Sequence, residues 1–171
     1  MNTIGTDEKF MEIALRQGKG ALAESTLPVG CVIVIDGKVL VEIKKSIASH
    51  FRMDHAEMLA LRIVTQERQA PTHAMTLYTT LEPCVMCFGA MLNSHMSRVV
   101  FALEDPFGGG TRLSSAALPP RHQNRLPEIV PGVLRGTSLD LFKQFFSATD
   151  DPYWSAHPEN PLYQLCMNAL T

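Results

Sequence analysis

Two short stretches of the chain combine side chains that bind metal ions with a side chain that can move protons. Residues 55–57 read His-Ala-Glu, and residues 83–87 read Pro-Cys-Val-Met-Cys. One imidazole nitrogen and two thiolates form a soft donor set that suits Zn²⁺. Three protein ligands leave the fourth tetrahedral position to water, as in catalytic zinc sites. We therefore expect one zinc ion per chain, held by His55, Cys84 and Cys87, with Glu57 beside it as the catalytic proton carrier.

Both stretches are expected at the starts of helices. Pro83 suits the first turn of a helix, because its missing N–H has no partner there in any case. The two cysteines would then share one face, and the helix N-terminus would favour their thiolate forms. The run from Ala56 to Glu67 is also predicted to be helical, which puts His55 near its start. Glu57 can share the site only around the first turn, since residues two apart face different ways along a helix.

A Cys-x-x-Cys pair also occurs in redox proteins and in closed structural zinc sites. A redox pair would leave His55 and Glu57 without a role. A structural zinc site would need a fourth ligand at suitable spacing, but Cys31 and Cys166 are isolated, and Cys31 lies in an apolar run. The joint pattern therefore favours a catalytic zinc site.

The motifs resemble those of the cytidine and deoxycytidylate deaminase superfamily, in which H-x-E is followed by P-C-x-x-C. Within it, the chain is similar to the branch of tRNA adenosine deaminases, guanine deaminases and cytosine deaminases, from about Phe10 to Phe146. The resemblance rests on Leu27-Pro28-Val29-Gly30, His55-Ala56-Glu57, the segment from Thr80 to Cys87, and Arg98-Val99-Val100-Phe101. It implies a hydrolytic deaminase that converts the exocyclic amine of a nucleobase or nucleoside to a carbonyl and releases ammonia. It also implies that Glu57 shuttles protons and that two copies form a homodimer.

The resemblance further implies a set of substrate-binding residues. In the tRNA adenosine deaminases an Asn that contacts the base lies eleven residues before the zinc His, and this position is Lys44 here. A lysine donates but cannot accept a hydrogen bond, so Lys44 either contacts a different substrate or is simply solvated. Phe107 either stacks on the substrate ring or pins its loop to the core. The full set of expected substrate contacts is Val29, Gly30, Lys44, Glu82, Pro83 and Phe107.

Strands and helices alternate along the chain, which predicts an α/β fold with a three-layer α/β/α sandwich around a mixed five-stranded sheet. An Asp36-Gly37 turn joins two apolar runs into an antiparallel hairpin, and helical crossovers should make the later strands parallel. The strands are expected at about 31–35, 38–43, 75–79, 98–102 and 128–134. Helices are expected from Thr6, across 56–67, after Pro83, from Thr137-Ser138 and across 161–170, with a connection at 66–72 and no regular structure in 104–127.

Length and composition fit a single deaminase domain over 1–171, with a core of about 6–147 and a C-terminal extension of about 150–171. No apolar run reaches the length of about 18–20 residues that a membrane span needs. The N-terminus shows no signal peptide, and two of the four cysteines belong to the metal motif. We therefore expect a cytoplasmic protein with no membrane partner.

Charge bears on the substrate. Nucleic-acid binding wants a basic surface, whereas the formal net charge here is −2 and the chain reads Ser-Ala-Thr-Asp-Asp after the last core helix. With Lys44 in place of Asn, this favours a small base or nucleoside of the guanine, cytosine or adenine type. The alternative is a tRNA-specific deaminase that converts wobble adenosine to inosine. A zinc module used only for binding would leave Glu57 without a purpose.

Overall fold

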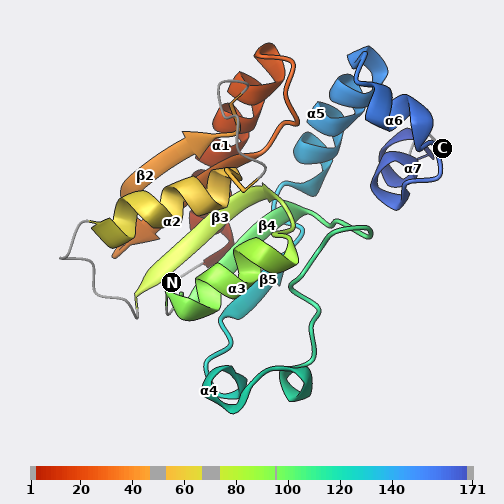
Figure 1. The fold of residues 1–171 in the computed structure, drawn as a ribbon. Helices are drawn as coiled ribbons and strands as arrows, with labels where there is room; N and C mark the ends of the chain where they lie inside the picture. Colours follow the sequence, from red (N-terminus) through yellow and green to blue (C-terminus); the bar gives the residue numbers. More distant parts are fainter. Residues whose placement is uncertain (1–2, 47–52, 67–73, 95, 169–171) are drawn as a thin grey trace.

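The structure, a computed structural model, describes residues 3–46, 53–66, 74–94 and 96–168 (Figure 1). A five-stranded sheet with the strand order β2-β1-β3-β4-β5 forms its centre. The strands are β1 (Gly30–Ile35), β2 (Lys38–Lys44), β3 (Met75–Leu81), β4 (Arg98–Leu103) and β5 (Glu128–Pro131). β1 runs antiparallel to both β2 and β3, whereas β3, β4 and β5 are parallel. The predicted mixed sheet is confirmed.

Helices cover both faces of this sheet and complete three layers (Figure 1). α1 packs on one face with α5 beside it, and α2 and α3 pack on the other. The helices are α1 (Thr3–Ala23), α2 (Ala56–Gln66), α3 (Val85–Asn93), α4 (Pro120–Gln123), α5 (Arg135–Ala148), α6 (Pro152–Ala156) and α7 (Pro161–Asn168), with a 3₁₀ turn η1 (Ser115–Ala117). The α/β/α sandwich is thus the observed fold. Among the described residues, no helix has the length and apolar character needed to cross a membrane.

The hairpin between β1 and β2 forms where the Asp-Gly pair predicted it. Asp36 and Gly37 both adopt positive φ, 48° and 74°, as a two-residue type I′ turn requires. β1 is buried along its whole length: Val32 and Val34 face α1, while Cys31, Ile33 and Ile35 belong to the core on the α2 and α3 side. A strand covered on both faces explains the continuous apolar run.

A buried ion pair joins α1 to the sheet. Asp7 Oδ1 accepts hydrogen bonds from Tyr78 Oη at 2.8 Å and from Arg98 Nη1 at 2.9 Å. Burial acts to raise the pKa of Asp7, but the hydrogen bonds from Arg98 and Tyr78 outweigh it and the pKa lies below its usual value. The expected helix start at Thr6 is wrong, because α1 already begins at Thr3. Asp7 is therefore an anchor inside the helix and not a residue of its first turn.

Other predicted boundaries also shift. α5 begins at Arg135, after Leu134 in a left-handed conformation, and the Ser138 hydroxyl donates to Thr80 O at 2.6 Å instead of capping the helix. β5 ends at Pro131, and the region 104–127 contains η1 and α4. Helix α6 was not expected from the sequence. The connection predicted at 66–72 falls mostly on 67–73, and the end of the last predicted helix falls on 169–170, outside the described residues.

Gly30 lets the backbone of β1 approach that of α1. A Cβ atom built on Gly30 would lie 2.1 Å from Ala14 O and 2.4 Å from Gly18 N, which are backbone atoms that cannot swing away. The Gly30 N–H donates to Thr80 Oγ1 at 3.1 Å, which holds β1 to β3 at the same point. Gly30 therefore serves close packing of helix on strand.

We predict that Gly30→Ala destabilises the protein by about 3 kcal/mol or more, because overpacking against fixed backbone forces the two elements apart. Gly89→Ala is the matched control, since a Cβ there meets nothing within 4 Å and Ala favours the helix by about 0.5–1 kcal/mol. Urea unfolding of both variants measures the difference. Equal stabilities would show that α1 and β1 do not touch at Gly30.

Candidate active site

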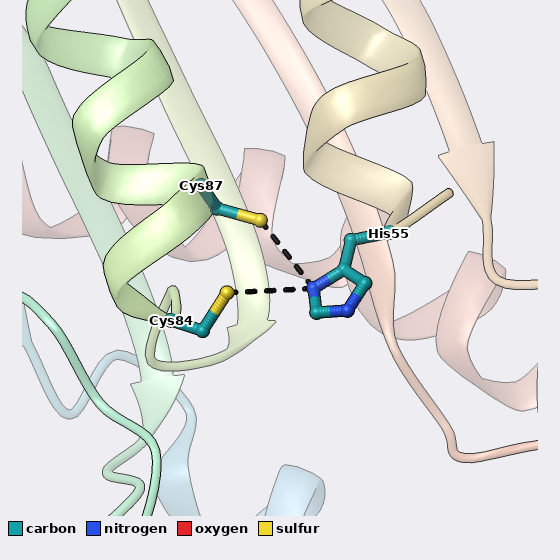
Figure 2. Close-up of side chains that lie close together, drawn as sticks. All are labelled: His55, Cys84 and Cys87. Carbon is teal, nitrogen blue, oxygen red and sulfur yellow. Dashed lines mark hydrogen bonds between the residues drawn. The ribbon is translucent and has the colours of Figure 1, made fainter. Parts of the chain in front are cut away.

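The two motifs meet where two helices begin (Figure 2). His55 directly precedes α2, and its carbonyl accepts the Leu59 N–H at 3.0 Å. Cys84 is the N-cap residue of α3, with φ −68° and ψ 168°, and its carbonyl accepts the Phe88 N–H at 2.8 Å. Pro83 therefore lies before the helix and not in its first turn. Both helix N-termini point at the same spot, which favours negative charge there.

Three side chains converge at this spot. His55 Nδ1 lies 3.5 Å from Cys84 Sγ and 3.5 Å from Cys87 Sγ (Figure 2). The three ligand atoms all lie within 4.8 Å of one another, and no fourth His, Cys, Asp or Glu in the described part of the chain joins the group. The structure thus brings together the three residues that the sequence analysis named as ligands.

The donor set fits a divalent cation such as zinc. The Cys87 thiol donates a hydrogen bond to Cys84, and this lowers the pKa of Cys84 to about 4 and raises that of Cys87. Two sulfurs and a ring nitrogen therefore share protons that a cation would replace. Thiolates need a metal or another positive charge when they are packed this closely. Three soft donors at the mouth of a cavity match the open form of a zinc site.

Glu57 lies beside this cluster and is 4% exposed. It occupies the second position of α2, just after His55 leaves the helical path, which is how two residues so close in sequence reach one site. Oε1 accepts a hydrogen bond from Thr79 Oγ1 of β3 at 3.0 Å, and Oε2 lies 3.8 Å from Cys87 Sγ. Burial raises the pKa of Glu57, although the Glu57 backbone N–H, His55 and Thr79 partly oppose this. One carboxylate oxygen is therefore held by the fold, and the other is directed at the ligands.

A cavity of about 150 Å³ opens next to His55, Glu57 and Cys84. A cavity of this size holds a single aromatic ring. Three of the residues expected to contact the substrate line it, namely Val29, Glu82 and Phe107. Gly30, Lys44 and Pro83 are not among its lining residues.

Strand alternation explains why Lys44 is outside the cavity and Lys45 inside. Lys44 is the last residue of β2, and its ammonium group pairs with Glu24 at the end of α1. Successive residues of a strand point to opposite faces, so the next side chain turns toward α2 and the cavity. Lys45 lines the cavity, and its positive charge reaches His55. The sequence analysis identified the correct basic pair but chose the wrong member as the cavity residue.

Glu82 is buried and holds the loop after β4. Its carboxylate accepts hydrogen bonds from the Asp105 N–H at 3.0 Å and from the Thr111 hydroxyl at 2.6 Å. Gly109 leaves room for it, since a Cβ there would lie 2.4 Å from the carboxylate. The Pro83 carbonyl accepts the Gly110 N–H at 2.8 Å and fixes the loop a second time. Glu82 and Pro83 thus position the cavity wall.

Phe107 is carried by this loop at the edge of the cavity. Its side chain is 62% exposed, so it does not pin the loop to the core. Its N–H and that of Gly108 donate to Asp105 Oδ1, each at 2.9 Å, which fixes the turn that presents the ring. Of the two roles open for Phe107, contact with a substrate ring is the one that this position allows.

Trp154 and Leu162 line the cavity from the C-terminal segment, which the sequence analysis did not connect with the site. Local signals for their helices exist in the sequence: Asp151-Pro152 and Asn160-Pro161 each place a capping side chain before a proline. Those signals predict helices, but nothing local tells which distant residues the helices will contact.

Comparison with known proteins places the chain in a family. The model for the cytidine and deoxycytidylate deaminase zinc-binding region matches residues 4–103. The chain belongs to this deaminase family, as the motifs implied.

Its relatives are more specific. A tRNA-specific adenosine deaminase of Bacillus subtilis is 33% identical over 142 residues, which is 82% of this chain and 88% of that protein. One from Agrobacterium fabrum is 28% identical over 139 residues, 80% of this chain and 91% of that protein. Among solved structures, one from a study of A-to-I editing by tRNA:A34 deaminases superposes with a TM-score of 0.66 at 26% identity, covering 78% of this chain and 98% of that one. A protein crystallised with 2,6-diaminopurine shares the fold, with a TM-score of 0.69 at 20% identity over 85% of this chain and 84% of that one.

Proposed function

We propose that the protein is a zinc-dependent hydrolytic deaminase that replaces the exocyclic amine of a nucleobase with a carbonyl oxygen. The observation that carries this proposal is the convergence of His55, Cys84 and Cys87 with a buried Glu57 at the mouth of a cavity large enough for one ring. Membership of the deaminase family supports the same chemistry. A redox role for the cysteine pair, or a zinc site used only for binding, would not need Glu57 at that place.

His55, Cys84 and Cys87 would hold the zinc ion. The chemistry that bound Zn²⁺ supplies is Lewis-acid activation of water near neutral pH. Glu57 Oε2 is the group that can accept a proton from water, because Oε1 is occupied by Thr79. Two proton transfers then balance the reaction: water loses a proton to Glu57 as the C–O bond forms, and Glu57 returns one as the C–N bond breaks and ammonia leaves. Burial of Glu57 keeps competing solvent away from this proton.

We predict that Glu57→Gln keeps stoichiometric zinc but lowers the rate of ammonia release by at least about a hundredfold, because Gln cannot carry the proton. Glu12→Gln, on the exposed side of α1, is the control for loss of one negative charge. Zinc is measured by elemental analysis and ammonia by a coupled assay. A Glu57→Gln enzyme with near-normal turnover would remove Glu57 from the mechanism.

We further propose that the amine belongs to the wobble adenosine of a tRNA. The sequence alone favoured a small base or nucleoside, but relatives with 33% and 28% identity over most of the chain are tRNA-specific adenosine deaminases. A free base or nucleoside is the second candidate. It is favoured by the small cavity and by exposed Asp150 and Asp151 at the end of α5, where a phosphate backbone would meet negative charge.

Ammonia release from a panel of substrates separates these two candidates. We predict turnover of a tRNA transcript with adenosine at the wobble position and none with the same transcript carrying guanosine there. Adenine, adenosine, guanine and cytosine complete the panel. Turnover of one of these small molecules without turnover of tRNA would reverse the assignment, while the proposed chemistry would stand.

Lys45 is proposed as a substrate contact, since it is the cation that lines the cavity. We predict that Lys45→Met lowers kcat/KM by about tenfold or more, because a hydrogen bond from a charged donor contributes about 1.5–3 kcal/mol. Lys44→Met is the matched control and should leave kcat/KM unchanged, since a half-exposed pair with Glu24 affects stability by less than about 1 kcal/mol. The opposite ranking of the two variants would show that Lys44 is the residue at the substrate.

A further inference from the structure

The C-terminal segment α6–α7 contributes two side chains to the catalytic cavity from more than sixty residues beyond the cysteine motif (Figure 1). Trp154 of α6 and Leu162 of α7 both line it. Both lie beyond residues 4–103, which the family model matches. The zinc ligands and Glu57 do not require these two residues, so their presence at the cavity needs another explanation.

Helix caps hold both residues in place. Asp151 Oδ1 accepts the Tyr153 N–H at 2.9 Å, which starts α6 one residue before Trp154. Asn160 is 3% exposed, and its Oδ1 accepts the Leu162 N–H at 2.9 Å, which starts α7 at the second cavity residue. Each cavity side chain thus sits in the first turn of a capped helix, where the backbone is fixed even though the helices are short.

Ring packing fixes the indole itself. Trp154 makes an edge-to-face contact with Phe146 of α5, with ring centroids 4.9 Å apart, and a second with Phe145 at 6.4 Å. Tyr163 of α7 packs on Phe146 from another side at 5.3 Å. The indole is therefore held by the core and remains only half-buried, with part of its surface at the cavity. A preorganised aromatic side chain beside an apolar cavity is suited to hold a planar heterocycle.

We propose that Trp154, supported by Leu162, is a specificity-determining residue that holds the substrate's heterocyclic ring in the cavity by aromatic contact. This proposal rests on the proposed function, because it assigns the ring's binding surface in the same site. Contact between an aromatic side chain and a base does not depend on the edge that carries the amine. The residue therefore selects for a planar aromatic base, whether the base is free or belongs to a polynucleotide, and Glu57 and the ligand cluster act on its amine.

Trp154 is the single tryptophan of the chain, so its fluorescence reports directly on this contact. We expect saturable quenching of the tryptophan emission when zinc-loaded Glu57→Gln protein, which binds without turnover, is titrated with the base or anticodon stem-loop that the wild type deaminates. The probes are adenosine, guanine, cytosine and a stem-loop with adenosine at the wobble position. Isothermal calorimetry with the same probes measures binding independently. Binding without a change in emission would overturn the proposal, and failure of every probe to bind would overturn it as well.

Kinetic variants provide the second test. We predict that Trp154→Ala raises KM for the deaminated substrate between about fivefold and a hundredfold with little change in kcat, and that Trp154→Phe restores most of the loss. Tyr153→Ala is the matched control, since Tyr153 is an aromatic residue of the same helix that is 45% exposed and does not line the cavity. Zinc content and melting temperature are recorded for each variant.

The outcomes separate this proposal from the proposed function. Equal KM values for Trp154→Ala and Tyr153→Ala, in protein that retains zinc and loses turnover with Glu57→Gln, would overturn the role of Trp154 alone. An unfolded Trp154→Ala protein leaves the decision to Trp154→Phe and to the emission titration, both of which keep an aromatic ring in place. Persistent turnover in Glu57→Gln would overturn the proposed function, while quenching by a bound base would still support the ring contact.

Discussion

The structure depends on two helix N-termini that meet at one end of the central sheet. α2 begins after His55 and α3 begins at Cys84, so an imidazole nitrogen comes within 3.5 Å of two sulfurs. Such a cluster is unfavourable without a cation, because two sulfurs cannot both lose their protons in a half-buried site. The sheet compels the contact nonetheless: α3 follows directly from β3, and α2 packs against β1 and β2 beside it. Formation of the fold therefore builds the donor set, and metal binding would in turn stabilise the fold.

Two buried glutamates show how the same side chain serves different ends. Glu82 gives its oxygens to the loop after β4, through the Asp105 N–H and the Thr111 hydroxyl. Glu57 receives one hydrogen bond from Thr79 and keeps its other oxygen at the cluster. A carboxylate whose oxygens are occupied fixes a shape, whereas one with a spare oxygen can move a proton. Hydrogen-bond partners, and not burial alone, distinguish the candidate catalytic residue from the structural one.

Much of the site could be predicted from the sequence because its chemistry is local. The ligands lie on two short motifs, and Asp36-Gly37 fixes one hairpin, so types and spacing suffice. Lys45 could not be chosen over Lys44 without the exact end of β2, since an error of one residue turns a side chain to the other face. Gly30 was named for its resemblance to a motif, yet its physical role is contact with Ala14 and Gly18, which the chain brings near only after folding. The position of Trp154 depends on tertiary packing alone, and no pattern in residues 150–168 points to the cavity.

The central claim is that one imidazole and two thiolates hold a zinc ion with one position open to solvent. X-ray absorption at the zinc edge of the purified protein tests it most directly. We expect one zinc per chain with two sulfur neighbours at about 2.3 Å, one imidazole nitrogen at about 2.0 Å and one further light-atom neighbour from water. A third sulfur or second imidazole in the coordination shell, or protein that binds no zinc, would contradict this account.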